Sequence, residues 1–214
     1  MWKRDFILGG RFVFILSALF CTGYGTAAAQ NAGVTNSVIV GTEGRVRVGR
    51  RGGPRLDEPM VNWPLLVGDR VVVGAQSQLT VRRLDESIYR FPEMTDFVIR
   101  PPRNASTQRS SFRLLSGVLY FFHRGRPGEV EVETPSASAA VRGTEFVISV
   151  DAAGTTIVTV MDGVVELSNA IDSVPVRSGE QGVAQPGVAP VVRPALNMAD
   201  TIQWMLYYPG VLDA

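Results

Sequence analysis

Few side chains in this sequence are placed to do chemistry. A hydrolytic site needs a nucleophile beside a base, and the chain has one histidine, His123, which follows the apolar pair Phe121-Phe122. We interpret His123 as a rim residue at the end of a strand rather than as a catalytic base. The one cysteine, Cys21, lies near the N-terminus. The sequence therefore predicts a protein that is not an enzyme.

Metal binding has little support in the residue pattern. Zinc and iron sites use several His or Cys ligands, and this chain has one of each. Calcium could bind carboxylate oxygens at Asp151 or Asp162, but Asp-Gly and Asp-x-x-Gly are mainly turn sequences. Glu129, Glu131 and Glu133 recur at every second position, which indicates the solvated face of a strand. We expect neither a metal nor a cofactor.

Arginines give the sharpest charge feature. Five of them, Arg45, Arg47, Arg50, Arg51 and Arg55, lie close together, and the first two would share one face of a strand. Two interpretations stay open: a solvated edge guarded by charge, or a surface for an acidic glycan, a lipid head group or a protein. A second, looser set surrounds a polar loop: Arg100, Arg103, Arg109 and Arg113.

The N-terminus reads as an export signal. Lys3 and Arg4 precede an apolar stretch over residues 12–20, and a run of alanines that ends at Ala29 offers a cleavage site. We predict a Sec-type signal peptide, residues 1–29, and a periplasmic or cell-surface location. The apolar stretch is about half of the roughly 20 residues that a spanning helix needs, and no later stretch is long enough to span a membrane.

Cleavage would change what the chain offers. It removes the one cysteine, so no disulfide, thiol nucleophile or thiolate ligand would remain. Of 21 basic and 20 acidic residues, 18 and 19 would be left, because Lys3, Arg4, Arg11 and Asp5 are lost. So balanced a charge exerts no long-range attraction on nucleic acid or anionic lipid, and any recognition must be local. We expect no nucleic-acid partner.

From Ser37 onward the chain is punctuated like a β-protein. Short Val-rich runs alternate with turns that carry Gly, Asp, Asn or Pro. Asp162-Gly163 separates two such runs and predicts a type I′ hairpin, and residues 151–154 predict a comparable turn. The tail differs, because residues 195–208 place apolar side chains at near-helical spacing between two prolines. A short, aromatic, amphipathic helix is the prediction there.

Several motifs carry a family resemblance. The residues in question are Thr134, Pro135, Arg142, Gly143, Thr144, Phe146, Asp162, Gly163, Gly179 and Glu180. A Thr-Pro followed shortly by Arg-Gly-Thr-x-Phe, with the further pieces in this order, resembles the FecR domain over roughly residues 65–185. The resemblance implies an all-β domain of stacked antiparallel β-hairpins, as a sandwich or a solenoid-like form.

The Arg-Gly-Thr motif also has a physical interpretation of its own. Gly143 lies between two strand-like runs and suggests a bulge that would aim Arg142 at fixed acceptors. Two roles stay open for Arg142. It is either a buried, hydrogen-bonded arginine that holds the fold together, or a direct contact to a ligand or partner.

FecR proteins typically join this periplasmic domain to a cytoplasmic arm and a membrane helix, and so control a sigma factor in response to an iron-chelate receptor. Only 11 residues precede the apolar stretch here, so we expect no cytoplasmic arm and no direct sigma-factor control. An exported, isolated FecR domain fits better. The tail resembles the join into tetratricopeptide repeats that are missing, which suggests a stand-alone or truncated form.

These observations predict four segments: a signal peptide (1–29), an N-terminal β segment (30–64), a FecR-like domain (65–185), and a linker with a short aromatic helix (186–214). We expect a non-enzymatic sensory or binding module of the cell envelope that has a protein partner and could serve signalling or iron-uptake regulation. The candidate partner surface comprises Arg45, Arg47, Arg50, Arg51, Trp204, Tyr207 and Tyr208.

Two alternatives stay open. One is a domain that binds carbohydrate or another envelope polymer, and the other is a structural or assembly protein. Against the first, the aromatic residues lie mostly inside strand-like runs, where burial in the core is expected. The sequence does not predict the oligomeric state.

Overall fold

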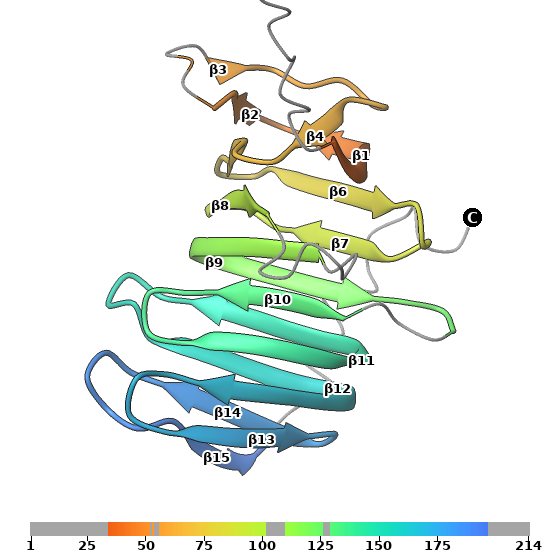
Figure 1. The fold of residues 1–214 in the computed structure, drawn as a ribbon. Helices are drawn as coiled ribbons and strands as arrows, with labels where there is room; N and C mark the ends of the chain where they lie inside the picture. The colour runs from red at the N-terminus through yellow and green to blue at the C-terminus, as the bar shows by residue number, and fades with distance from the viewer. Residues whose placement is uncertain (1–33, 52, 54–55, 102–109, 126–128, 197–214) are drawn as a thin grey trace, which may run out of the picture. The chain divides into compact units, whose positions relative to one another are not determined.

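Two rows of β-strands face each other across one apolar core. The computed structural model describes residues 34–51, 53, 56–101, 110–125 and 129–196, and every regular element among them is a strand (Figure 1). The predicted all-β class is therefore confirmed. The strands are β1 (Val34–Glu43), β2 (Val46–Gly49), β3 (Leu56–Asp57), β4 (Pro64–Leu66), β5 (Arg70–Val73), β6 (Gln78–Arg83), β7 (Ile88–Phe91), β8 (Thr95–Arg100), β9 (Ser110–Phe122), β10 (Val130–Glu133), β11 (Ser138–Val150), β12 (Thr156–Ser168), β13 (Ser173–Arg177), β14 (Glu180–Ala184) and β15 (Val191–Pro194).

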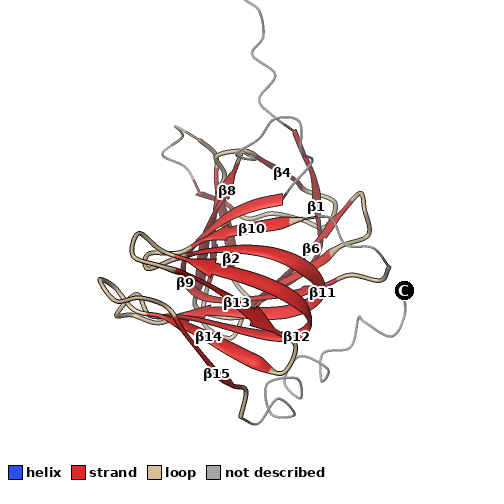
Figure 2. Cartoon of the chain, turned by 60° about the horizontal axis from the view of Figure 1, so that its bottom comes forward, coloured by secondary structure: helices blue, strands red, loops and turns tan. Residues whose placement is uncertain are grey.

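Hydrogen-bonded pairing divides the strands between the two rows. Row A runs β3, β2, β5, β8, β9, β10, β11, β12, β13. Row B runs β4, β1, β6, β7, β9, β11, β12, β14, β15. All of these pairs are antiparallel except β9 with β10. Figure 2 brings forward the end of the stack that holds β13, β14 and β15.

Three long strands, β9, β11 and β12, belong to both rows, and each changes row at a glycine. β11 pairs with β10 up to Val141 and with β9 from Glu145 onward, so it crosses at Gly143. β12 pairs with β14 up to Thr159 and with β13 from Val164 onward, so it crosses at Gly163. The bulge predicted at Gly143 is confirmed by a register shift in the β11–β12 ladder.

The hairpin predicted at Asp162-Gly163 is wrong. Gly163 does have the positive φ that such a turn requires, at 109°, but it stands opposite Gly143 inside β12. The residues on both sides of it pair with the same strand, β11, so the chain bends without reversing. The reversal lies earlier, at the turn predicted over residues 151–154, where Asp151 N donates to Thr155 O at 3.1 Å.

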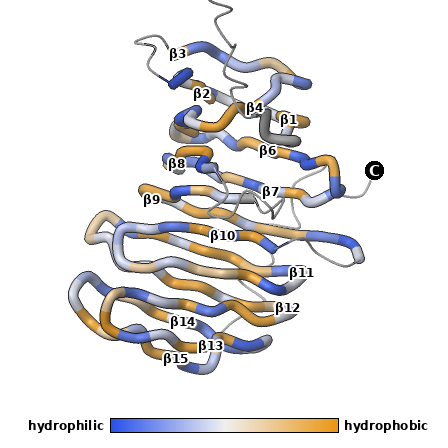
Figure 3. Tube along the Cα trace, viewed as in Figure 1, coloured by the Kyte–Doolittle hydropathy of each residue, from blue (hydrophilic) through white to orange (hydrophobic). Residues whose placement is uncertain are grey.

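Apolar and polar residues alternate along the strands (Figure 3), and the apolar side chains of both rows meet in one cluster. Rings cross between the rows: Phe91 of row B stacks on Phe97 of row A with 3.9 Å between centroids, and Tyr89 lies 4.8 Å from Phe112. All but one of these rings are fully buried, and Phe112 is 2% exposed. The two rows are therefore the layers of a sandwich.

The crossing point has no room for side chains. A Cβ at Gly143 would lie 2.6 Å from Asp162 O, and a Cβ at Gly163 would overlap the Cα of Gly143. Gly163→Ala must therefore strain its own φ and also push the two strands apart. We expect it to lower the free energy of unfolding by about 3 kcal/mol or more.

Chemical denaturation measures this effect, and Gly187→Ala is the matched control. Gly187 also has a positive φ, 74°, but nothing lies within 4 Å of a Cβ there. The control should lower the free energy of unfolding by about 1 kcal/mol, because only the strain of a positive φ at alanine is added. Equal losses for the two variants would show that β11 and β12 do not approach closely at Gly163.

Candidate functional site

The FecR-like motif residues separate into two groups, one at the turn before β11 and one around the middle of β11 and β12. The first is the Thr134-Pro135 turn, which joins β10 to β11. Thr134 Oγ1 donates to Ala137 O at 2.9 Å and accepts from Ala137 N at 3.0 Å, and Thr156 Oγ1 donates to Thr134 Oγ1 at 2.7 Å. Thr134 is 9% exposed and Thr156 is fully buried. The threonine therefore closes the turn and ties it to β12.

Ser136 extends this network to row B. Its hydroxyl lies 2.8 Å from Thr156 Oγ1 and 3.0 Å from Ala184 O of β14. Thr156 uses its proton on Thr134, so the proton of Ser136 is shared between the other two acceptors. Each buried hydroxyl thus has a partner, and the turn links β10, β11, β12 and β14.

Replacing the central hydroxyl by a methyl group tests this network. Thr156→Val keeps the side-chain shape but removes the donor to Thr134 and the acceptor for Ser136. We expect a loss of about 1 to 3 kcal/mol in the free energy of unfolding, because buried partners are left unsatisfied. Thr155→Val, at the half-buried neighbouring position, should change stability by less than about 0.5 kcal/mol. Similar values for both variants would contradict the network.

The second group forms a corner where β11 and β12 cross, which we call the glycine corner: Arg142, Gly143, Thr144, Asp162 and Gly163. Thr144 Oγ1 donates a short hydrogen bond to the Asp162 carboxylate, which joins the strands just beyond the bulge. Phe146, two residues on, is fully buried and stacks on Phe121 at 4.9 Å. Thr144, Asp162 and Phe146 all stabilise the fold here.

The remaining motif residues support the corner from the β13–β14 turn. Gly163 N donates to Ser178 Oγ at 3.0 Å, and Gly179 N donates to Val160 O at 2.9 Å. Glu180 accepts from Arg177 N through its carboxylate at 2.8 Å. Gly179 has a φ of 84°, which suits the tight turn between β13 and β14.

Arg142 is the exception in this group. The predicted alternative of a buried arginine is wrong, because its side chain is 80% exposed and only Nε approaches a partner, Glu129 Oε1, at 3.4 Å. Alternation explains the exposure: Val141 faces the core, so Arg142 faces solvent. A shallow depression at the corner is lined by Glu129, Arg142, Gly143, Thr144, Asp162 and Gly163.

Arg142 belongs to a larger surface, the outward side of row A, which we call the charged face. It carries arginines and acids from eight strands or their ends: Arg47, Arg70, Asp96, Arg100, Arg113, Glu129, Glu131, Glu133, Arg142, Glu166 and Arg177. Arg100 Nε lies 3.8 Å from Glu133 Oε2, and Arg70 Nε lies 3.0 Å from Asp96 Oδ1. The hydrogen bond to Asp96, and then its charge, raise the pKa of Arg70.

The predicted solvated row of Glu129, Glu131 and Glu133 is wrong for its middle member. Glu131 does point outward, but it is only 9% exposed. Its strand, β10, lies between β9 and β11, so neighbours enclose it on both sides. Period-2 spacing identifies the face on which a residue lies but not how deeply its neighbours cover it.

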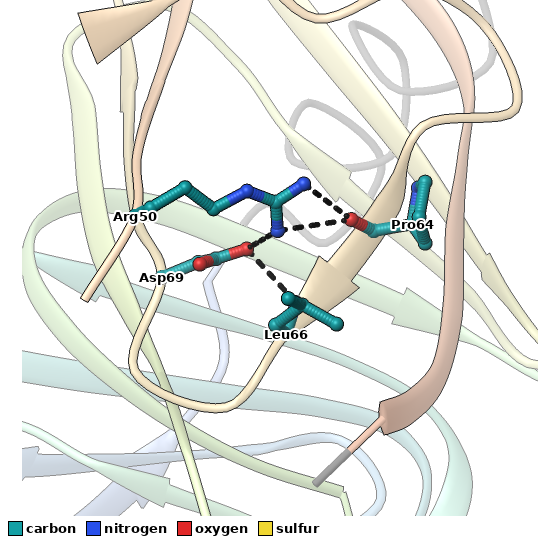
Figure 4. Close-up of polar contacts among 4 residues, drawn as sticks. All are labelled: Arg50, Pro64, Leu66 and Asp69. Atoms are coloured by element: carbon teal, nitrogen blue, oxygen red, sulfur yellow. Dashed lines mark hydrogen bonds and ion pairs between the residues drawn. The ribbon is translucent and has the colours of Figure 1, made fainter. Parts of the chain in front are cut away.

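The structure separates the N-terminal arginines. Arg45 and Arg47 are exposed and flank buried Val46 in and before β2, so the shared face predicted for them is confirmed. Arg51 is also exposed, and its stem lies against Gly68. Arg50 differs: it donates to the fully buried Asp69 at 2.5 Å and to Pro64 O at 3.3 Å (Figure 4). Trp204, Tyr207 and Tyr208, with the predicted helix, lie outside the described residues.

Arg50 therefore has a structural role. Its guanidinium also lies over the Trp63 ring, 5.1 Å from the centroid, and Asp69 accepts a second bond from Leu66 N at 2.8 Å. These contacts join β4 to the residues that follow β2. Arg50→Met would leave the Asp69 carboxylate buried with one donor, and we expect a loss of about 2 to 4 kcal/mol in stability.

Arg47→Met is the matched control, because Arg47 is exposed on the charged face. It should change the free energy of unfolding by less than about 0.5 kcal/mol. Thermal or denaturant unfolding compares the two variants. If both substitutions lower the free energy of unfolding equally little, the structural role of Arg50 is wrong.

His123 is not the predicted rim residue. It is 7% exposed, its Nδ1 lies 3.2 Å from Ser87 Oγ, and its backbone N donates to Thr144 O. Ser87 is 1% exposed, so this serine and histidine pair is closed to a substrate. In the described part of the chain, no cluster of three His, Cys, Asp or Glu side chains could hold a metal ion.

The fold and these motifs define a class, a two-row β-sandwich built around the Thr-Pro turn and the glycine corner. Residues 69–166 match the family described as FecR protein, so this part of the chain is a FecR domain. No curated protein matches it. None of the residues that the structure describes form a helix with the length and hydropathy needed to cross a bilayer.

Two crystal structures of a protein from Parabacteroides distasonis ATCC 8503, described as an anti-sigma factor, share the fold. The 1.65 Å structure is 16% identical with a TM-score of 0.52, and covers 63% of this chain and 64% of that one. The 2.50 Å structure is 15% identical with the same TM-score, and covers 63% of each chain. The likeness therefore spans less than two-thirds of that protein's length.

Proposed function

We propose that this chain is a non-enzymatic signalling module that works outside the cytoplasm and binds a protein partner through the charged face. Binding of the partner to the charged face is the event that the module signals. The FecR domain and the fold shared with a protein described as an anti-sigma factor support a regulatory role. Iron-uptake regulation is the form of signalling that the family resemblance suggests.

One observation carries this proposal: Arg142 is the one Arg-Gly-Thr-x-Phe motif side chain that the fold leaves largely exposed. Gly143 allows the strand to bend, Thr144 bonds to Asp162 across the bend, and Phe146 packs in the core. The side chain of Arg142, in contrast, is 80% exposed to solvent. Along the same face, arginines and acids alternate with nearly equal numbers of each sign. Such a mosaic gives little attraction to nucleic acid but can specify the register of a protein partner.

The aromatic residues argue against the carbohydrate-binding alternative. Tyr89, Phe91, Phe97 and Phe121 are fully buried in the core and cannot form a sugar-stacking platform. The location rests on residues 1–29, whose basic start, apolar stretch and small residues are typical of an export signal.

Site-specific photo-crosslinking in cells tests the partner. The full chain would carry a photoreactive residue at Arg142 or, as a control, at Ile171, which is 59% exposed in the turn between β12 and β13. We expect a discrete protein adduct in the envelope fraction from position 142 only. Cytoplasmic fractionation of the chain, or identical products from both positions, would contradict the proposal.

Charge reversal then tests the chemistry of recognition. Arg113→Glu on the charged face should weaken partner binding by roughly tenfold or more, because like charges would meet across the interface. Arg82→Glu is the matched control, since Arg82 is half-exposed on the outward side of row B. Equal effects of the two variants on the adduct yield would place the interface elsewhere.

A further inference from the structure

The outward side of row B carries an apolar patch that the proposed function does not use. Val118, Tyr120, Phe122, Val147 and Met161 form a second apolar cluster, separate from the core, which we call the row B patch. The residues between them, such as Leu119 and Ile148, are fully buried in the core, so the patch side chains point away from it. Yet Tyr120 is only 8% exposed and Val147 only 6%.

The polar group in this patch is already satisfied. Tyr120 OH donates to Glu145 Oε1 at 2.8 Å. Burial, and then this hydrogen bond, raise the pKa of Tyr120, so the phenol stays neutral. What the patch itself offers to an occupant is therefore apolar surface, bordered by Glu145 and by Arg90, which stands opposite Tyr120 on β7.

The chain leaves the described part of the fold at the edge of row B, the same layer that carries this patch. Ala195 N donates to Gly179 O at 2.9 Å, and Gly179 N donates to Val160 O at 2.9 Å. Val160 precedes Met161, a member of the patch, and Leu196 is 80% exposed. The C-terminal segment, residues 197–214, thus starts at the β15 edge of row B, two strands from Met161.

The segment is long enough to cover the patch. From β15, where the segment begins, across β14, β12 and β11 to β9 is about 19 Å, at about 4.8 Å per strand. Twelve residues, 197–208, would span about 18 Å as a helix and about 40 Å extended. Both conformations therefore reach the patch, and the extended segment spans all of it.

The composition of the segment matches an apolar surface. Its charged side chains are Asp200 and Asp213. The apolar and aromatic side chains that it offers are Met198, Ile202, Trp204, Met205, Leu206, Tyr207 and Tyr208. As a helix it would gather Met198, Ile202 and Met205 on one face. These residues would otherwise meet water.

We propose that the row B patch is the docking site of the chain's own C-terminal segment, residues 197–208. The short tether favours this occupant over a second copy or another protein, because it gives an effective concentration on the order of millimolar. The aromatic tail then serves the fold of its own chain rather than a partner. This assignment does not depend on the proposed function of the charged face.

Tryptophan fluorescence tests the docking in the full chain. The three tryptophans are Trp2, Trp63 and Trp204, so Trp2→Phe with Trp63→Phe leaves Trp204 as the sole reporter. We expect blue-shifted emission and weaker acrylamide quenching than in a synthetic peptide of residues 195–214. Values equal to those of the peptide would overturn the proposal.

Substitutions on each side separate docking from other effects. In the reporter chain, Met161→Asp should shift Trp204 emission and quenching to the peptide values, and so should Ile202→Asp, which leaves the strands untouched. Val98→Asp is the control, because Val98 is half-buried on the outward side of row A; it should change neither. If Ile202→Asp leaves Trp204 protected, or if protection falls on dilution as it would for a second copy, the intramolecular site is wrong.

Discussion

The close approach of β11 to β12 at Gly143 and Gly163 is the constraint on which both rows depend. Without side chains at these positions, the paired strands bend together and pass from row A to row B. One half of each strand then lies in row A and the other half in row B. The backbone of these strands therefore connects the two layers along this side of the core. Gly117, with a φ of 91°, lies where β9 makes the same change of row.

This bend also explains why the motif combines residues of such different chemistry. Thr144 and Asp162 lock the crossing, and Phe146 fills the layer that the strand enters. Arg142 precedes the bend on the solvent side, so the exposed side chain is adjacent in sequence to those that build the fold. Thr134 performs the corresponding structural task at the far end of β11.

The class of the fold was readable from the sequence, because alternation and turn residues are local properties. The strand at residues 129–133 and the turn at 151–154 follow from such signals. The crossing at Gly163 could not be read in the same way, since Asp-Gly supports a turn or a bulge and only the pairing of distant strands decides between them. β15 lies in residues 186–214, where a linker and a helix were predicted, because Pro194 weakens the strand pattern there.

The site shows the same division between local and long-range information. The exposed face of Arg45 and Arg47 follows from alternation, whereas Arg50 finds Asp69 through a contact between distant segments. The buried positions of His123 and Glu131 depend on neighbouring strands that local spacing does not reveal. The motif residues, which are neighbours in sequence, therefore differ in the structure: most of them support the fold, and Arg142 is exposed to solvent.

The most direct test of the strand crossing is a nuclear Overhauser measurement between the α-protons of Gly143 and Gly163. In the structure the two residues stand opposite each other, and the Gly143 Cα occupies the place of a Gly163 Cβ. A strong cross-peak, with slowly exchanging amides on β12 on both sides of Gly163, is the predicted result. Absence of that cross-peak, together with contacts between Met161 and Val164 that mark a tight hairpin, would contradict the two-row fold and the exposed placement of Arg142.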